Sequence, residues 1–333
     1  EGYLRYQIKD YFGLTLGREN LTYGYGFYNK LFISNISAPF DYLRLDLHHG
    51  AIYYSFIYGN LRGDSLGKPL ENKHIITHRL DLKFNKYFNF GFWEAVITPN
   101  NSISFNFLNP VSFLRTASYS SEEDNEDNLL MGIDFLSNPF KNTLLQFSFL
   151  IDDLNFSTLF KEKRDNKFAY QVGFRNYDFL GVDNLYFTAE YIKITPFIYT
   201  HRSNKSTYSH WGINIGPNLN PNSDEIKIGF NYWVNNRINF DININYQRHA
   251  DGIIYDGGNI KYNFGGNLLN GDGDLISKFN FLEGDRKDFK GIEINLRVEP
   301  IKQLFVDFYF FKKWLLSQKG TYQLFYLTLS EEI

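Results

Sequence analysis

The sequence of 333 residues contains no cysteine, one methionine and little net charge, and these shortages exclude several classes of protein. Without cysteine there can be no disulfide, thiolate zinc site or cysteine nucleophile. A net charge of -3 gives no electrostatic reason to expect nucleic acid as a partner. No apolar run approaches the roughly 18 residues that a membrane-spanning helix needs, and the mean hydropathy is -0.36. We therefore expect neither a nucleic-acid-binding protein nor a helical membrane protein.

Aromatic residues, in contrast, make up 19% of the chain, with 34 Phe and 25 Tyr. A soluble core of this size ordinarily relies on Leu, Val, Ala and Met, so the composition favours strands and interfaces. Many of these rings share one face of a segment, as do Phe88, Phe90 and Phe92. Such rings are favoured in the girdles that flank the lipid band of a transmembrane β-barrel.

Strict alternation of apolar and polar residues is the pattern that decides the fold class. It is clearest at 237–247, where Ile, Phe and Tyr alternate with Asn, Asp and Gln, and it recurs at 42–48, 76–84 and 291–299. Successive side chains of a strand point to opposite faces, so each segment has one apolar and one polar face. Most such segments are about 8 to 12 residues long, near the length that a tilted strand needs to cross a bilayer.

We therefore predict a single all-β domain over residues 1–333, a transmembrane antiparallel β-barrel of about 18 strands, with 16 as the alternative. A large soluble β-protein such as a solenoid is the competing interpretation, but the short repeat that it requires is not visible. Residues 28–35 and 207–215 are among the predicted wall strands. Long and short connections alternate up to about residue 195, after which the pattern is lost. Either 184–202 is one long strand, or Pro196 divides it.

The polar faces predict the character of the lumen. A dry sandwich core would have to pair each of their charges, whereas a water-filled or plugged lumen accommodates them. Both signs occur in similar numbers, which favours an interior braced by ion pairs over an ion-selective pore. The predicted lumen-lining residues are Arg44, Asp46, His48, Arg79, Asp81, Lys83, Glu190, Asp241, Asn243, Glu293 and Arg297.

The connection at 98–127 is the most distinctive loop. Loops of this length are usually functional, and this one is a candidate to fold into the lumen as a plug. Its aromatic and polar residues suit sugar binding, because rings stack on apolar sugar faces while polar groups bond the hydroxyls. The candidate ligand-binding residues are Asn109, Phe113, Arg115 and Tyr119. A solvated outer loop, kept soluble by its acidic run, is the alternative interpretation.

Candidate catalytic groups are scarce. Glu94 falls by parity on an apolar face, where a charge at mid-bilayer is costly. We therefore expect a bulge, a position near the headgroups, or a strand 88–97 that turns its Trp93 face to lipid. Asp152 and Asp153 point to opposite faces of one strand and therefore make a poor carboxylate pair for hydrolysis. The seven histidines lack the spacing of a helical zinc motif. No catalytic residue, metal site or cofactor is predicted.

Six phrases occur in an order that resembles a known family. They are the segments Gly17–Asn35, His78–Val96, Leu108–Pro110, Leu150–Asp153, Tyr199–Arg202 and Tyr208–Asn218. Together they resemble the Wzi family of outer-membrane proteins, which is associated with capsule and exopolysaccharide assembly. The resemblance implies an 18-stranded barrel, no catalytic activity and a lectin-like role in holding polysaccharide at the bacterial surface.

We therefore predict a non-enzymatic outer-membrane barrel whose partners are membrane lipid and surface polysaccharide. A passive porin-like channel and a barrel subunit of a larger surface or secretion assembly, with other envelope proteins as partners, are the alternatives. The chain begins at Glu1 without an initiator Met or a leader, and it is short for the family. We expect a processed or trimmed chain, with the missing length mostly at the N-terminal side.

Overall fold

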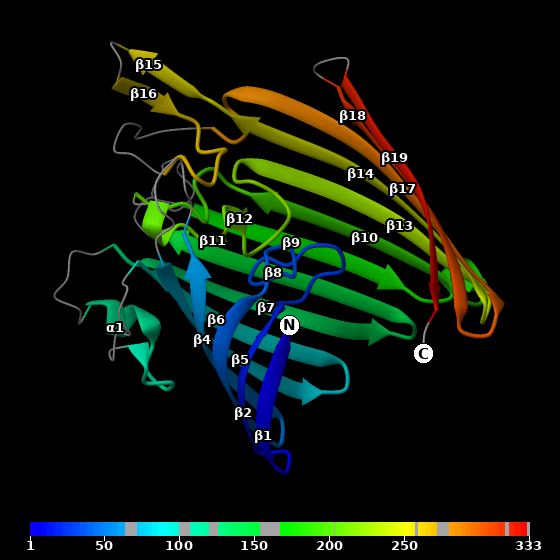
Figure 1. Ribbon diagram of the computed structural model, residues 1–333, viewed down its shortest axis with the longest axis horizontal. Coiled ribbons are helices and arrows are strands. Elements are labelled where there is room, and N and C mark those ends of the chain that lie inside the picture. Colours follow the sequence, from blue (N-terminus) through cyan, green and yellow to red (C-terminus); the bar gives the residue numbers. More distant parts are fainter. Residues whose placement is uncertain are drawn as a thin grey trace.

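One large curved antiparallel sheet, which we call the wall, dominates the computed structural model (Figure 1). The structure describes residues 1–63, 72–99, 107–119, 126–153, 167–202, 204–256, 259–271, 280–316 and 320–331. The wall strands are β1 (Gly2–Ile8), β2 (Phe12–Glu19), β3 (Phe40–His49), β4 (Ile52–Arg62), β5 (Asn72–Asn85), β6 (Phe88–Thr98), β7 (Asn128–Phe140), β8 (Thr143–Asp153), β9 (Lys167–Asn176), β10 (Leu185–Ile194), β13 (Ser223–Asn235), β14 (Ile238–Asp251), β17 (Asp285–Ile301), β18 (Leu304–Leu315) and β19 (Gly320–Glu331).

The wall strands pair in chain order, with β1 and β19 as the two end strands. The described residues therefore contribute fifteen strands to the wall, compared with the predicted 18 or 16. The remaining elements are small: helix α1 (Leu114–Tyr119), the single turns η3 (Phe179–Gly181) and η4 (Asn204–Ser206), and the hairpins described below. The predicted all-β antiparallel architecture is confirmed.

Side chains alternate between the two faces of the wall, as the sequence pattern predicts. Asp46 of β3 and Ser55 of β4 are partners on the concave face, which we call the lumen face, and Leu45 and Phe56 are partners on the outer face. Partly exposed apolar residues of the outer face include Leu43, Leu47, Ile133, Val172, Ile228 and Ile244. A wall that faces lipid tails presents an exposed apolar band of this kind.

Short and long connections alternate along the wall from β1 to β18, and the last connection, 316–319, is again short. Short turns such as 50–51, 141–142 and 236–237 lie at one end, which we call the short-turn end. Long connections, including 20–39, 99–127, 195–222 and 252–284, lie at the opposite, long-loop end. The predicted loss of this alternation after residue 195 is therefore wrong.

The reason is that predicted wall strands such as 207–215 belong to the long connections. Residues 195–222 contain their own hairpin of β11 (Ser209–His210) and β12 (Ile213–Asn214), and residues 252–284 contain β15 (Ile253–Asp256) and β16 (Asn259–Asn263). Left-handed backbone at Phe197, Tyr199 and Trp211 turns the chain away from extended structure. Residues 28–35 likewise form no wall strand, and only Ile33 makes an isolated bridge, to Tyr23.

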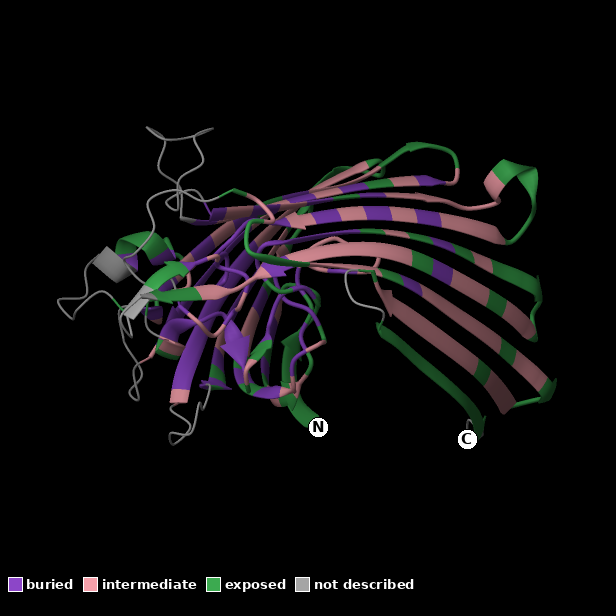
Figure 2. Ribbon diagram, turned by 90° about the horizontal axis from the view of Figure 1, so that it is seen from above, coloured by how far each residue is buried: buried purple, intermediate pink, exposed green. Residues whose placement is uncertain are grey.

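Residues 20–39 and 195–222, which we call the first and second internal segments, pack together on the lumen face. Leu31, Phe32 and Ile33 of the first segment and Tyr199 and Tyr208 of the second are fully buried in one apolar cluster. Figure 2 shows the buried residues concentrated toward the long-loop end, while the strand ends near the short turns are intermediate or exposed. The hydrophobic core of the protein therefore lies inside the curve of the wall.

Phe32 is the centre of this core. Its ring stacks on Trp93 of β6, with centroids 4.7 Å apart. A Cβ at Gly132 of β7 would lie 2.2 Å from the Phe32 ring, so only glycine allows this approach. Burying a phenylalanine side chain contributes about 1.5–3 kcal/mol, which helps to hold the first internal segment against the wall.

Candidate functional site

The carboxylate of Glu190 anchors the tip of the first internal segment. Its two oxygens accept the backbone N–H groups of Phe27, Tyr28 and Asn29, with donor–acceptor distances of 2.6, 3.0 and 2.9 Å. Gly26 makes the tight turn possible, because a Cβ there would overlap the carbonyl oxygen of Asn29. Three convergent N–H groups form an anion-binding concavity of the kind found in backbone nests.

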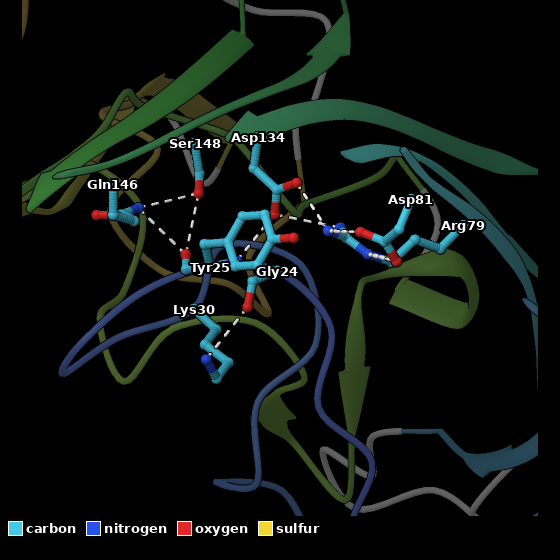
Figure 3. A network of polar contacts seen from close by, with 8 residues as sticks. All are labelled: Gly24, Tyr25, Lys30, Arg79, Asp81, Asp134, Gln146 and Ser148. Carbon is cyan, nitrogen blue, oxygen red and sulfur yellow. Dashed lines mark hydrogen bonds and ion pairs between the residues drawn. The ribbon is translucent and has the colours of Figure 1, made fainter. Parts of the chain in front are cut away.

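A second anchor joins Tyr25 to β5, β7 and β8 (Figure 3). The Tyr25 N–H donates to Asp134 at 2.8 Å, and its carbonyl oxygen accepts bonds from Gln146 at 3.1 Å and Ser148 at 3.0 Å. Both backbone groups of this residue are therefore bonded to side chains of the wall, which satisfies the rule that buried polar groups find partners.

Arg79 completes this network by bridging two carboxylates. Its guanidinium lies 2.6 Å from Asp81 and 2.8 Å from Asp134, and it is almost fully buried (Figure 3). Lys30 contributes from the first internal segment by donating to the carbonyl of Gly24 at 3.1 Å. Burial lowers the pKa of Lys30, while the carboxylates of Glu190 and Asp134 oppose that shift.

The second internal segment is held by a buried ammonium. Lys73 of β5 donates to the carbonyl of Thr207 at 2.7 Å and to the hydroxyl of Ser209 at 3.0 Å. On the opposite side, the carboxylate of Asp152 accepts the N–H of Tyr199 at 2.6 Å. Asp152 therefore has a structural role here, in line with the sequence argument against a hydrolytic pair.

The two internal segments also bond to each other. The hydroxyl of Tyr199 donates to the carbonyl of Leu31, and that of Tyr208 to the carbonyl of Phe32, both at 2.8 Å. These bonds lie inside the apolar cluster, where an unpaired hydroxyl would be costly. The pair of segments thus forms one packed unit inside the curve of the wall at the long-loop end.

His210 secures the second segment to the wall in its neutral form. Its Nδ1 accepts the N–H of Arg62 at 2.9 Å, and the residue is 2% exposed. Burial, and next the positive charge of Lys73, lowers the pKa of His210 to about 4. A protonated ring could not accept this bond, so the contact requires the neutral imidazole.

The predicted lumen-lining residues lie on the lumen face, but they differ in what they contact. Arg79 and Glu190 anchor the first internal segment, and Asn243 accepts the hydroxyl of Tyr28 at 2.9 Å. The others bond mainly within the wall: Arg44 with Asp46, Asp241 with Asn231, Glu293 with Lys227, and Arg297 with Asp307. Asp81 pairs with Arg79, whereas His48 and Lys83 stand near the short-turn end.

Sequence reasoning missed the anchors Asp134, Lys73 and Asp152. Asp134 follows Gly132 on the lumen face of β7, within an alternating segment, so parity could have found it. Lys73 and Asp152 stand near the long-loop ends of their strands, and nothing in the local pattern distinguishes them from solvated charges.

The described part of the predicted plug, residues 107–119, lies on the outer face of the wall. In the described residues 107–119, Phe107, Leu114 and Ala117 pack on the outer-face residues Phe56, Ile76 and Val96. For these residues the prediction that 98–127 enters the lumen is wrong, because the two internal segments occupy it and an apolar outer face is available. Residues 100–106 and 120–125 lie outside the described residues.

The candidate ligand-binding residues follow this loop to the outer face. Asn109 is exposed and accepts the N–H of Val111 at 3.1 Å, closing a turn. The ring of Phe113 is 61% exposed and meets Phe92 edge-on, and Arg115 is exposed. The backbone of Tyr119 ends α1, and its side chain lies outside the described residues. The structure therefore does not gather these residues at the lumen.

An exposed indole marks the long-loop end. Trp211 lies in the turn between β11 and β12, with left-handed backbone and a side chain that is 47% exposed. Its ring contacts that of the buried His210, and the backbone N–H of Trp211 donates to the carbonyl of Arg62 at 3.3 Å. A rigidly mounted indole of this kind offers a flat surface for stacking.

The part of the chain that the structure describes contains neither a candidate metal site nor a membrane-spanning helix. There, no group of three or more His, Asp or Glu side chains could hold a metal ion. The helices among the same residues are too short and too polar to cross a membrane.

Known structures share this architecture. One is Wzi from Escherichia coli, an outer membrane protein involved in group 1 capsule assembly and described as a carbohydrate-binding β-barrel; the TM-score is 0.64 at 12% identity, covering 99% of this chain and 67% of that one. Another is the outer membrane protein OprD from Pseudomonas aeruginosa, with a TM-score of 0.52 at 12% identity, covering 96% and 75%. At such identities the likeness establishes the fold of an outer-membrane β-barrel.

The family follows from the sequence match. No curated protein sequence matches the chain significantly, whereas the model of the capsule assembly protein Wzi matches residues 1–323. The match and the barrel neighbours place the chain in the bacterial outer membrane. The chain belongs to the Wzi family of capsule assembly proteins.

Proposed function

We propose that the protein binds surface polysaccharide at the long-loop end and does so without catalysis. The observation that carries this proposal is the filled lumen: two internal segments, bonded to the wall and to each other, occupy the space that a porin leaves to solutes. Long loops of outer-membrane barrels face the cell exterior, where capsular polysaccharide lies. The carbohydrate binding described for Wzi of Escherichia coli supports the same ligand class.

Trp211 is the proposed stacking surface. Its indole is fixed by the β11–β12 turn, and a sugar ring can place its apolar face on it. The same internal segment carries the exposed cations Arg202 and Lys205, and Arg62 is exposed at the end of β4. Positive groups on the same segment as an aromatic surface suit polysaccharides with acidic sugars.

Binding of purified capsular polysaccharide to the detergent-solubilised protein tests this site. Trp211→Ala is expected to weaken binding roughly 3- to 10-fold, the equivalent of about 1 kcal/mol of stacking. The matched control is Trp233→Ala, because Trp233 is 38% exposed but lies beside the short turn 236–237. Unchanged binding after Trp211→Ala, or an equal loss in both variants, would remove Trp211 from the site.

A passive channel and a subunit of a larger assembly are the competing functions. The polar residues near the short-turn end would suit the passage of solutes, but the internal segments occupy the lumen face at the long-loop end. Conductance in planar bilayers separates the passive channel from the proposed polysaccharide-binding barrel: for the latter we expect no steady opening of porin size. A stoichiometric envelope protein that remains bound after mild detergent extraction would instead favour the assembly subunit.

A further inference from the structure

A polar cluster interrupts the apolar outer face near the long-loop end. His78 of β5 and Glu94 of β6 are register partners, and Nε2 of the histidine lies 2.8 Å from a carboxylate oxygen of the glutamate. The hydroxyl of Tyr54 lies 3.0 Å from the other ring nitrogen. Glu94 is only 1% exposed. A carboxylate on the outer face is therefore covered, and its strand has no bulge at this position.

Residues 107–119 provide the cover. The N–H of Leu114 donates to the Glu94 carboxylate at 3.2 Å, and the Tyr54 hydroxyl donates to the carbonyl of Pro110. Apolar side chains on either side of these bonds pack on the wall around Ile76. A buried charge is tolerated where hydrogen bonds satisfy it, so the cluster and its cover stabilise each other.

The cover reaches down to the purely apolar part of the outer face. Across β5, β6 and β7, the row that contains Glu94 is followed toward the short-turn end by the row of Leu80, Phe92 and Ile133. The Phe113 ring meets Phe92 of this lower row, with centroids 6.5 Å apart. Figure 1 shows α1 at the long-loop end, beside the wall.

Two large apolar side chains near the start of the cover are exposed. Val111 is 84% exposed and Phe113 is 61% exposed. Large apolar side chains that are exposed in this way indicate an interaction surface. Because the surface continues the lipid-facing outer wall, the partner that fits it is the acyl-chain region of the outer leaflet.

We propose that residues 107–119 form a cover at the lipid boundary, in which Val111 and Phe113 contact acyl chains while His78 and Glu94 act as positioning residues that hold the segment on the wall. The cover presents apolar side chains to lipid in place of the polar cluster. It is independent of polysaccharide binding, which is assigned to Trp211 of the second internal segment.

Site-directed spin labelling tests the position of the cover, since the native chain has no cysteine to remove. Val111→Cys, Ile244→Cys and Lys205→Cys would be labelled with a nitroxide and reconstituted in vesicles of phosphatidylethanolamine and phosphatidylglycerol. Ile244 is the lipid control, 54% exposed on the outer face of β14, and Lys205 is the aqueous control at the long-loop end.

The label at 111 should match the label at 244, with high accessibility to oxygen and an accessibility to a water-soluble nickel chelate several-fold below that at 205. Accessibilities equal to those at 205 would overturn the proposal, and so would a label at 111 that neither reagent reaches, since it would then be covered by protein.

A second variant tests the positioning residues. Glu94→Leu removes the acceptor of the Leu114 N–H, so the label at 111 should become more mobile and gain access to the nickel chelate. Glu94→Gln keeps an acceptor oxygen and should retain the lipid-like signature. Heat-modifiable migration in gels verifies that each barrel is folded. Unchanged accessibility in the folded Glu94→Leu variant would remove Glu94 from this role.

Discussion

The two halves of the lumen are built by different means. At the long-loop end the internal segments bring apolar residues and backbone groups against the wall, and wall side chains such as Glu190, Asp134 and Lys73 bond them. Toward the short turns, charged residues bond mainly to neighbours across strands and stay partly exposed, as Arg297 does with Asp307. In the first arrangement packed segments cover the lumen face of the wall, whereas in the second only side chains line it.

This comparison shows where the free energy of folding is concentrated. Ion pairs that keep contact with water contribute little, because solvent screens them and fixing the side chains costs entropy. A buried carboxylate that satisfies three backbone N–H groups contributes much more, because its loss leaves those groups unpaired. The filled half should therefore be sensitive to single substitutions and the lined half tolerant of them.

The largest effect is expected for Glu190→Ala. It leaves the N–H groups of residues 27–29 without their acceptor and should lower the free energy of unfolding by at least about 3 kcal/mol, as measured by urea titration in detergent. Frequent channel openings should appear in planar bilayers as the segment loosens. The matched control is Glu293→Ala, which loses only side-chain bonds to Lys227 and Tyr309. Equal effects of the two variants would contradict the distinction between the halves.

An intermediate effect is expected from pH, through His210. The unfolded chain takes up a proton near the ordinary histidine pKa of about 6.5, whereas the folded chain resists protonation down to about pH 4. The stability that this residue contributes is therefore complete above pH 6.5 and is lost as the pH falls toward 4. Melting temperatures at pH 7.5 and 4.5 should differ less in His210→Asn than in the native chain. An identical pH dependence in both proteins would exclude this histidine as the cause.

The smallest effect is expected for Arg297→Ala. The Arg297 side chain is 46% exposed and pairs with Asp307 at 2.7 Å, so its removal should change the free energy of unfolding by less than about 1 kcal/mol. Urea titration at low and high salt measures this directly. A loss of several kcal/mol would show that the short-turn half is as tightly organised as the filled half.

The sequence predicted the wall better than its contents, for a physical reason. A wall strand repeats one environment every second residue, so Leu43 to Leu47 reveal their faces without any knowledge of the partner strand. Residues 28–35 instead contain the apolar run Leu31–Ile33, and their partners are another loop and the lumen face. Such contacts depend on tertiary packing and leave no period in the sequence.

The sequence did not predict the position of the cover, residues 107–119, for the same reason. Glu94 was correctly placed on the apolar face by parity, but the segment that resolves the conflict lies 20 residues further along. The loop length at 98–127 predicted a function inside the barrel, since that is a frequent use of long loops. The direction in which such a loop folds depends on which surface is free to accept it.

The order of the strands constrains how the barrel can mature. Each wall strand pairs with its sequence neighbours, so the wall can grow locally, whereas the first internal segment binds Glu190, which lies more than 160 residues later in the chain. Closing so long a loop is entropically costly until the intervening strands are in place. A barrel stalled during insertion before β10 would therefore leave residues 27–29 unbound and open to proteases. Occupancy of the Glu190 carboxylate thus reports that assembly has passed its midpoint.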